Sequence, residues 1–311
     1  MAVRVAINGF GRIGRNIYRS IIESGRTDIE VVAVNDLGPV ETNAHLLRYD
    51  SVHGKFPHEV TVNGDMITAG GKPFKVTAVK DPTQLPHKEL GVEIVLECTG
   101  IFTSREKAAA HLTAGAKKVI VSAPAEGADY TVVYGVNDAG LSKDQIIISN
   151  GSCTTNCLAP MAMIMDELVG IEKGMMTTIH SYTGDQPTLD TMHKDLYRAR
   201  AAALSQIPTS TGAAKAIGPV LPQLKGKLDG ISIRVPTPNV SLVDLNFVAK
   251  RNTTPKEVND ALIAASNGKL KGIMTYTNHP LVSSDLNHDP HSATILLDQT
   301  KVIEGNFVTV F

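Results

Sequence analysis

The stretch that decides the fold is VRVAINGFGRIG, residues 3–14. Its first six residues form a compact apolar run that is typical of a buried strand. Directly after this run, Gly9, Gly11 and Gly14 follow the G-x-G-x-x-G pattern and open a segment with helical periodicity. The first glycine permits a tight turn, the second lets the backbone approach a pyrophosphate, and the third lets helix and strand pack closely. The stretch therefore predicts a dinucleotide site at the first strand-to-helix turn.

An acidic residue follows at the position that such a site requires. Asp36 ends the next apolar run, IEVVAVND, 22 residues after Gly14. A carboxylate there accepts hydrogen bonds from the ribose 2′-hydroxyl group and repels a 2′-phosphate. We therefore expect NAD rather than NADP, against the alternative of a glycine-rich turn with an incidental acid.

The rest of the first half alternates strand and helix. VEIVLECTG (92–100) and KKVIVSAPA (117–125) are apolar runs that flank SREKAAAHLTAG (104–115), a predicted helix with Ser104 as its N-cap. Residues 59–79 alternate with period two around an Asn-Gly turn and predict a hairpin. This alternation implies an α/β fold with a Rossmann-type, doubly wound parallel sheet.

The pattern changes after Ser149. We expect a helix at about 153–168, a strand over GMMTTIHSYT (174–183), a polar loop over 185–206, and then strands of period two around a helix that begins near Pro255. These features predict a second, α+β domain with a mixed or antiparallel sheet. The predicted domains are an NAD-binding domain over residues 1–150 and a catalytic domain over residues 151–311.

Composition limits the class of protein. The chain has 311 residues, a net charge of −1 and three cysteines. The balanced charge does not suggest nucleic acid or a membrane as a partner, and few cysteines suit a reducing compartment. The chain begins at once with a strand and contains no apolar run of ~18 residues or more, so we expect neither a signal peptide nor a membrane span. These features predict a cytoplasmic globular protein.

Two of the cysteines, Cys153 and Cys157, lie four residues apart in SNGSCTTNC (149–157). This spacing allows a metal site, a redox pair, a packing pair, or a nucleophile with an inert neighbour. A zinc site needs further cysteine or histidine ligands nearby, and a redox pair is more often C-x-x-C. Ser152 is a predicted N-cap, which places Cys153 in the first helical turn, where amides and the helix dipole lower a thiol pKa. We therefore favour Cys153 as a nucleophile and Cys157 as a small buried hydrophobe, with no metal site.

A nucleophilic cysteine needs a base, and His180 is the histidine that we favour. It ends the run MMTTIH, where a strand opens into a loop in the domain that carries Cys153. We expect it to pair with the thiolate and to act as general acid and base. His53, His87 and His111 lie in segments that resemble surface, and we expect them to be solvated.

Cysteine, histidine and NAD together indicate the oxidation of an aldehyde. Attack by a thiolate on an aldehyde gives a hemithioacetal, which can lose a hydride and become a thioester. The amide of Cys153 could stabilise the oxyanion that forms. The acyl group must then pass to phosphate or water.

Two further segments predict anion binding. PTSTGAAKAIG (208–218) is a Ser/Thr/Gly turn that we expect to feed a helix, with the Thr211 and Gly212 amides at its start. Arg234 lies in an apolar strand, where it is either paired in the structure or aimed at an anion in a cleft. Three more cations could line the same region or belong to a solvated or subunit-interface loop: Lys194, Arg198 and Arg200.

These segments together closely resemble the glyceraldehyde-3-phosphate dehydrogenase family of phosphorylating, NAD-dependent oxidoreductases. The matching stretches span nearly the whole chain: AINGFGRIGR, VNDL, ECTG, SNGSCTTNC, TIHSYTGDQ, RARAAA, PTSTGAAKA, RVPTPNVS and NHDPHS. The resemblance implies oxidation of D-glyceraldehyde 3-phosphate to 1,3-bisphosphoglycerate in glycolysis, with NAD and inorganic phosphate as partners. It also implies a homotetramer in which the long loop after His180 packs against the cofactor site of a neighbouring subunit.

The resemblance also assigns roles to residues. It implies Cys153 as the acyl-accepting nucleophile and His180 as its base. The implied cofactor-binding residues are Gly9, Gly11, Arg12, Ile13, Gly14, Asp36 and Ser122. The implied phosphate-binding residues are Thr183 and Arg234 for the substrate, and Ser152, Thr154, Thr211 and Gly212 for inorganic phosphate, with Arg198 as a further contact.

The sequence departs from the family at its end. The chain stops at KVIEGNFVTVF (301–311), where the family continues with a Tyr-Asp-Asn-Glu segment and a final helix that packs on the cofactor domain. This end leaves open a truncated, catalytically impaired NAD-binding protein. A second alternative, an erythrose-4-phosphate dehydrogenase, stays open because those enzymes share the cysteine–histidine–NAD core. Thr183 in HSYTGDQ favours glyceraldehyde 3-phosphate as the substrate.

Overall fold

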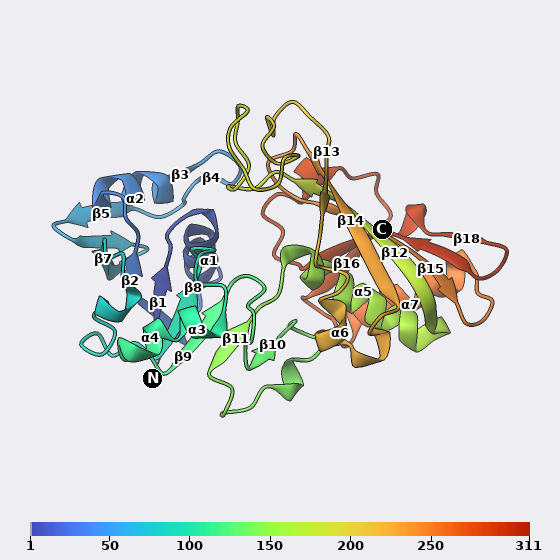
Figure 1. The fold of residues 1–311 in the computed structure, drawn as a ribbon, viewed down its shortest axis with the longest axis horizontal. Coiled ribbons are helices and arrows are strands. Elements are labelled where there is room, and N and C mark those ends of the chain that lie inside the picture. Colours follow the sequence, from blue (N-terminus) through green and yellow to red (C-terminus); the bar gives the residue numbers. More distant parts are fainter. Residues whose placement is uncertain (1) are drawn as a thin grey trace. The chain divides into compact units, whose positions relative to one another are not determined.

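The computed structural model describes residues 2–311 and divides them into two compact units. The N-terminal unit contains the residues up to Val132 together with Leu141–Gly151. The C-terminal unit contains Val133–Gly140 and Ser152–Phe311 (Figure 1). Each unit has its own hydrophobic core.

The N-terminal unit is built on a nine-stranded sheet. Its strands are β1 (Val3–Asn8), β2 (Ile29–Asn35), β5 (Val60–Asn63), β6 (Met66–Ala69), β7 (Lys72–Thr77), β8 (Ile94–Glu97), β9 (Lys118–Val121), β10 (Tyr130–Thr131) and β11 (Ile147–Ser149). Their order is β10-β11-β9-β8-β1-β2-β7-β6-β5, parallel from β10 to β7 and antiparallel in β7-β6-β5. The predicted doubly wound parallel sheet and the predicted hairpin are both confirmed. Since β2 and β8 flank β1 on opposite sides, the strand order reverses between β1 and β8, which is where such folds bind ligands.

The helices of this unit are short except for the first. They are α1 (Arg12–Glu23), α2 (Val40–Arg48), η1 (Pro82–Gln84), α3 (Arg105–Ala108) and α4 (Ala110–Thr113). Strands β3 (Tyr49–Asp50) and β4 (Gly54–Lys55) form a separate small ribbon. The short helix η2 (Asp138–Gly140) lies in the part of the chain that belongs to the C-terminal unit. In α1 the buried ring of Tyr18 lies 4.8 Å from the ring of Phe74. The predicted helix over 104–115 divides into α3 and α4, and Ser104 caps the first of them by accepting a hydrogen bond from the Lys107 amide.

One face of this sheet carries an apolar groove of about 660 Å³. Val5 and Leu96 from the sheet and Ile17 from α1 are among the side chains that line it.

The C-terminal unit is built on a six-stranded mixed sheet. Its strands are β12 (Ile171–Ser181), β13 (Ile207–Ser210), β14 (Leu228–Val235), β15 (Leu242–Ala249), β18 (Lys301–Ile303) and β19 (Phe307–Val310), and β16 (Met274–Thr277) with β17 (Ala293–Leu296) forms a separate parallel pair. The order is β13-β14-β12-β15-β19-β18. Only β12 and β14 are parallel within this sheet, which confirms the predicted mixed sheet.

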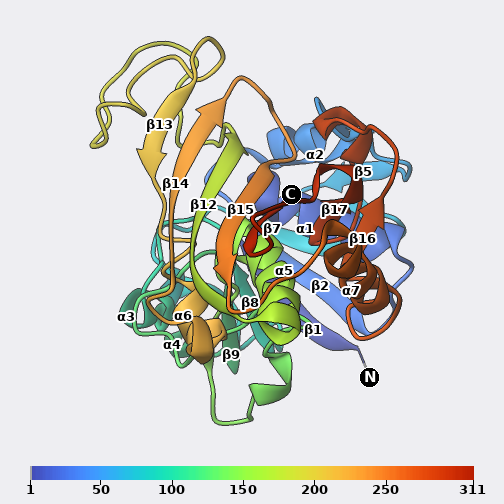
Figure 2. The ribbon, with the colours of Figure 1, turned by 90° about the vertical axis from the view of Figure 1, so that its right-hand side faces the viewer.

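One face of this sheet is covered by helices. The helices of the unit are α5 (Cys153–Val169), α6 (Ile217–Val220), α7 (Pro255–Asn267), η3 (Pro222–Leu224), η4 (Ser283–Leu286) and η5 (Leu297–Gln299). Helix α5 packs against β12 and β15, and α7 packs against α5 (Figure 2). Because the N-terminus of α5 and the C-terminal end of β12 carry Cys153 and His180, this packing positions both residues of the predicted pair.

Candidate active site

The glycine-rich turn after β1 has the geometry that the sequence predicts. Gly9 has a φ of +90°, a conformation that L side chains rarely adopt. A Cβ on Gly14 would lie 2.1 Å from the Gly9 carbonyl oxygen, so only glycine permits this approach. Gly11 is the N-cap of α1, has open space beside it, and leaves the first amides of the helix without a side-chain cap. These uncapped amides fit an anionic group such as a pyrophosphate.

Asp36 lies beside this turn. Its carboxylate accepts hydrogen bonds from the Phe10 amide, at 2.9 Å, and from the Gly38 amide, at 3.2 Å. These bonds hold the acid at the end of β2, next to the helix that would receive the pyrophosphate. A carboxylate at this position can accept hydrogen bonds from a nucleotide ribose.

The other predicted cofactor residues lie around the same sheet edge. Arg12 and Ile13 are the first two residues of α1; the Arg12 guanidinium binds Asp50 at 2.7 Å, and Ile13 is exposed. Ser122 follows β9, and its amide donates to the Glu97 carbonyl oxygen at 2.9 Å.

The expectation that His87 and His111 are solvated is wrong. Both side chains are buried, with 2% and 0% exposure, and they form a chain with the equally buried Glu97. The helical segment that carries His111 turns this ring towards the sheet, where the carboxylate provides a partner. Sequence reasoning missed this cluster because its members are far apart in the chain.

Cys153 and His180 form a pair in the C-terminal unit. Ser152 caps α5 by accepting a hydrogen bond from the Thr155 amide at 3.0 Å, so the predicted N-cap is confirmed and Cys153 is the first helical residue. The Cys153 sulfur lies 3.1 Å from His180 Nε2. On its other side, His180 Nδ1 donates to the Ser181 carbonyl oxygen at 2.6 Å. Because that carbonyl only accepts, Nδ1 carries a proton, and Nε2 is the atom that exchanges a proton with the thiol.

The surroundings of Cys153 favour its thiolate. Protein atoms packed around the thiol would by themselves raise its pKa, but the His180 hydrogen bond and charge, followed by hydrogen bonds from Thr154, outweigh this effect. The net result is a Cys153 pKa below the ordinary cysteine value. The residue also remains exposed to solvent, as a nucleophile must be.

Cys157 differs from Cys153 in every respect that governs reactivity. We predicted a buried side chain for Cys157. The structure shows it half-buried, because it packs at the edge of the core of the C-terminal unit. Burial, with a smaller effect of Cys153, raises the pKa of its thiol to about 12. Cys157 is therefore an unreactive neighbour rather than a second nucleophile.

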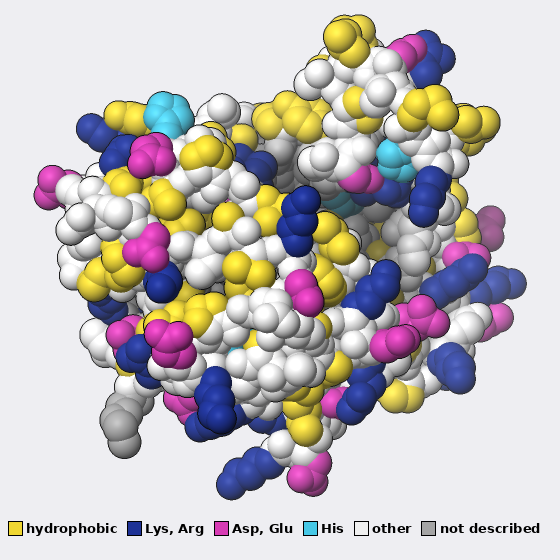
Figure 3. All heavy atoms as spheres, turned by 60° about the vertical axis from the view of Figure 1, so that its left-hand side comes forward, with side chains coloured by type: hydrophobic (Ala, Val, Ile, Leu, Met, Phe, Trp, Pro, Cys, Tyr) yellow, Lys and Arg dark blue, Asp and Glu magenta, His cyan; other side chains and the backbone are white. Residues whose placement is uncertain are grey.

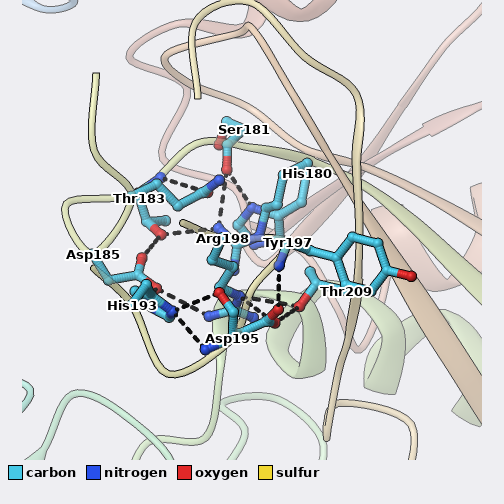
Figure 4. Close-up of polar contacts among 11 residues, drawn as sticks. His180, Ser181, Thr183, Asp185, His193, Asp195, Tyr197, Arg198 and Thr209 are labelled. Carbon is cyan, nitrogen blue, oxygen red and sulfur yellow. Dashed lines mark hydrogen bonds and ion pairs between the residues drawn. The ribbon is translucent and has the colours of Figure 1, made fainter. Parts of the chain in front are cut away.

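Two arginines and two threonines form a polar cluster near His180 (Figure 4). Arg234 pairs in register with His180 on the adjacent strand, and its Nη1 donates to Thr183 Oγ1 at 2.9 Å. Arg198 Nε donates to Thr209 Oγ1 at 3.1 Å. Burial, followed by the charge of Arg198, lowers the pKa of Arg234, and its Nε atom has no partner among residues 2–311. This cluster supplies the donors that a phosphate group requires.

Sequence reasoning missed Asp185, whose carboxylate accepts hydrogen bonds from two members of this cluster, Thr183 and Arg198. Thr183 Oγ1 donates to one oxygen of its carboxylate, and Arg198 Nη1 donates to the other at 3.0 Å. Asp195 plays a similar part at Thr209, whose hydroxyl donates to it at 2.7 Å. The only signal in the sequence was the position of Asp185 two residues after Thr183.

The remaining predicted phosphate residues are less closely joined. Thr154 is buried beside Cys153, and Ser152 Oγ also contacts Thr155 Oγ1 at 2.7 Å. The helix expected to start at Gly212 begins only at Ile217, so the Thr211 and Gly212 amides do not lie in its first turn. Residues 213–216 form a turn instead, and Thr211 and Gly212 stay outside the contacts that join Arg198, Thr183 and Arg234.

Every helix among residues 2–311 is too short or too polar to traverse a lipid bilayer. His, Cys, Asp and Glu side chains form no group of three or more that could hold a metal ion in this part of the chain.

A dinucleotide-binding unit joined to a unit with a cysteine–histidine pair defines a class of protein: NAD-dependent oxidoreductases that use a thiol nucleophile. Residues 3–105 match the NAD binding domain of glyceraldehyde 3-phosphate dehydrogenase, and residues 152–311 match its C-terminal domain. The chain belongs to the glyceraldehyde-3-phosphate dehydrogenase family.

Relatives with this name match the whole chain. The glyceraldehyde-3-phosphate dehydrogenase of Xanthobacter flavus is 72% identical, that of Cereibacter sphaeroides 67%, and that of Geobacillus stearothermophilus 58%. In each case the match covers 100% of this chain and 92% of the relative. These matches favour the glycolytic oxidoreductase over the two alternatives that the sequence left open.

Proposed function

We propose that this chain oxidises D-glyceraldehyde 3-phosphate to 1,3-bisphosphoglycerate with NAD and inorganic phosphate, as part of glycolysis. The observation that carries the proposal is the 3.1 Å contact between the Cys153 sulfur and His180 Nε2 at the start of α5. It places a thiol with a lowered pKa beside a group that can take and return a proton.

The steps follow from this pair. The Cys153 thiolate, whose proton His180 Nε2 has taken, attacks the aldehyde carbon, and the Cys153 amide at the helix N-terminus is available to the oxyanion that forms. His180 Nε2 returns the proton to this oxyanion, which gives the hydroxyl group of the hemithioacetal. His180 Nε2 then takes the proton from the hemithioacetal hydroxyl group as hydride leaves. NAD, when bound, supplies the hydride acceptor. Phosphate attacks the resulting thioester, and the Cys153 thiolate departs as the leaving group.

Residues of the N-terminal unit would hold NAD. The pyrophosphate fits the uncapped amides of α1 at Gly11, Arg12 and Ile13, where Gly9 and Gly14 shape the turn. Asp36 would bind the adenosine ribose, and Ser122 would lie near the nicotinamide half.

We assign two phosphate sites in the C-terminal unit. Thr183 and Arg234 would bind the substrate phosphate, since they share a hydrogen bond on adjacent strand ends. The site for inorganic phosphate would comprise Ser152, Thr154, Arg198, Thr211 and Gly212. In both sites a phosphate has to displace the Asp185 carboxylate from Thr183 or Arg198.

The reaction can be tested directly. NADH formation is measured from glyceraldehyde 3-phosphate and NAD, with and without inorganic phosphate, and with erythrose 4-phosphate as a competing substrate. Phosphate-dependent turnover of the three-carbon substrate is expected. A higher kcat/KM for erythrose 4-phosphate, or no turnover at all, would contradict the proposal.

Replacing Arg234 with glutamine is expected to raise the KM for glyceraldehyde 3-phosphate by about tenfold or more, because a charged hydrogen bond to the substrate phosphate contributes roughly 1.5–3 kcal/mol. Steady-state kinetics would give the change. Arg200→Gln is the matched control, since Arg200 pairs with Asp190 on the exposed loop. An unchanged KM in Arg234→Gln, with a raised KM in the control, would place the substrate phosphate elsewhere.

We also propose a cytoplasmic homotetramer. The loop over residues 185–206, which extends beyond the ends of β13 and β14 in Figures 1 and 2, exposes several large apolar side chains: Leu189, Met192, Leu196, Tyr197 and Leu204. Yellow hydrophobic side chains are prominent on the projecting upper right part of Figure 3. The outer face of the sheet exposes a second set: Met175, Ile231, Leu242 and Phe307. A tetramer with dihedral symmetry needs two different interfaces, and these two surfaces supply them.

Leu196→Glu is expected to dissociate the assembly at the loop interface. Leu196 is 81% exposed in one subunit, so a charge there costs little in the monomer but is strongly unfavourable once the interface buries it. Sedimentation velocity or native mass spectrometry would show dimers or monomers in place of tetramers. Leu141→Glu, at an exposed position outside both surfaces, serves as the control and should stay tetrameric. A tetrameric Leu196→Glu protein would remove the loop from the proposed interface.

A further inference from the structure

The last side chains of three neighbouring strands form a buried hydrogen-bonded chain below the glycine-rich turn. Asn35, Asn8 and Glu97 end β2, β1 and β8 respectively. Asn35 Nδ2 donates to Asn8 Oδ1 at 2.8 Å, and Asn8 Nδ2 donates to Glu97 Oε2 at 2.6 Å. All three side chains are buried. These hydrogen-bonded side chains therefore connect the strand ends at which the strand order reverses, between β1 and β8.

The Glu97 carboxylate is surrounded by donors. Its Oε1 accepts from the Thr99 amide at 2.8 Å and from the Thr99 hydroxyl group. Its Oε2 accepts from Asn8 and contacts His111 Nε2 at 2.9 Å. Every one of these neighbours can donate a hydrogen bond to the Glu97 carboxylate oxygens.

Two histidines extend this series of buried hydrogen bonds beyond Glu97. His111 Nδ1 contacts His87 Nε2 at 3.2 Å, and both rings are buried. Burial, followed by the charge of His111, lowers the pKa of His87 to about 4, so His87 is neutral. His111 Nε2, in contact with Glu97 Oε2, is the partner that makes a buried carboxyl group tolerable in the core.

The Thr99 amide that Glu97 binds belongs to the Cys98–Thr99 peptide, and this peptide packs against Gly9. A Cβ on Gly9 would lie 2.7 Å from the Thr99 nitrogen and 2.8 Å from the Cys98 carbonyl carbon. The Cys98 amide in turn donates to the Asn8 carbonyl oxygen at 2.7 Å. Any rotation of the Cys98–Thr99 peptide would therefore displace Gly9, and with it the uncapped amides that follow Gly11.

We propose that Glu97 is a positioning residue for the dinucleotide: through Thr99 and Asn8 its carboxylate fixes the Gly9 turn in the conformation that binds the pyrophosphate, and His111 keeps that carboxylate in place. Glu97 does not touch the cofactor in this assignment. The inference rests on the NAD site proposed for the turn. It predicts that changes in these buried hydrogen-bonded side chains weaken NAD binding more than they change the reactivity of Cys153.

The test compares variants of the full chain by titration calorimetry with NAD. Glu97→Gln keeps the size of the side chain but replaces one accepting oxygen with an NH₂ group, which faces the groups that donate to Glu97. The Kd for NAD is therefore expected to rise about tenfold or more. His111→Leu should weaken NAD binding similarly. His111→Gln, whose Nε2 can still donate to Glu97, should restore the Kd to within about threefold of the original.

Two measurements separate positioning from a loss of stability. Tyr18→Phe removes another buried hydrogen bond of the same unit, from Tyr18 Oη to the Ala69 carbonyl oxygen at 3.0 Å, and should leave the Kd unchanged. The alkylation rate of Cys153 without NAD should be the same in all variants. Folded Glu97→Gln and His111→Leu proteins that bind NAD normally would overturn the inference, as would equal weakening by Tyr18→Phe. Failure of the unaltered chain to bind NAD would instead refute the proposed NAD site.

Discussion

Cys153→Ser is expected to lower phosphate-dependent NADH formation by about 10⁴-fold or more. A serine hydroxyl group in this position keeps its proton at neutral pH, whereas the Cys153 thiol has a lowered pKa through its contact with His180 Nε2. Without the thiolate there is no hemithioacetal and no thioester. Because Cys153 is exposed at the first position of α5, the folded state should be unaffected. Steady-state turnover and thermal unfolding of the two proteins would be measured together.

Cys157→Ala is the matched control for this substitution. Cys157 lies one turn further along α5, and burial raises its thiol pKa to about 12. The control should retain most of the turnover and the rapid alkylation of one thiol. Comparable loss of activity in both variants would mean that the start of α5 has a structural role and that Cys153 is not specifically the nucleophile.

His180→Gln is expected to lower turnover by about 10²–10⁴-fold, the usual contribution of a general acid and base. It should also change the pH dependence of thiol alkylation. The His180 hydrogen bond and charge oppose the pKa-raising effect of burial on Cys153, so their removal raises the Cys153 pKa. The thiolate then forms only at higher pH, and the alkylation midpoint moves upward, towards or beyond the ordinary value of ~8.5.

Alkylation by iodoacetamide between pH 5 and 10 would measure this shift. His279→Gln is a suitable control, because His279 lies in a turn after β16 and not on β12. An alkylation midpoint that does not move in His180→Gln would show that the helix N-terminus and Thr154 alone activate the thiol. That result would leave His180 with a role in proton transfer only.

The features that sequence reasoning found are local in the chain. The Gly9–Gly14 turn, the Ser152 cap and the placement of Cys153 at the start of a helix depend on residues within one or two turns of each other. Backbone conformation and capping act over that same range, so the spacing of residue types is enough to predict them. Hydrophobic periodicity likewise predicted the doubly wound parallel sheet and the mixed sheet.

The features that sequence reasoning missed depend on contacts between distant segments. We expected the helix after the Ser/Thr/Gly turn to start at Thr211 and Gly212, but it begins only at Ile217. Asp185 pairs with Arg198 across the long loop, and no local signal indicates which cation an acid in such a loop will meet. The same holds for His87 and His111, whose polarity and neighbours suggested a surface position.

By itself, the sequence determined the class of fold, the dinucleotide turn, the acid at the end of β2 and the cysteine at the start of α5, because each is set by neighbours along the chain. Only the tertiary structure decided that His180 Nε2 lies 3.1 Å from the Cys153 sulfur, and that Glu97 is held between Asn8, Thr99 and His111. The physical reason is that a hydrogen bond depends on distances of a few ångströms in space. Where segments are separated by tens of residues, those distances are set by how strands pair and how helices pack on them.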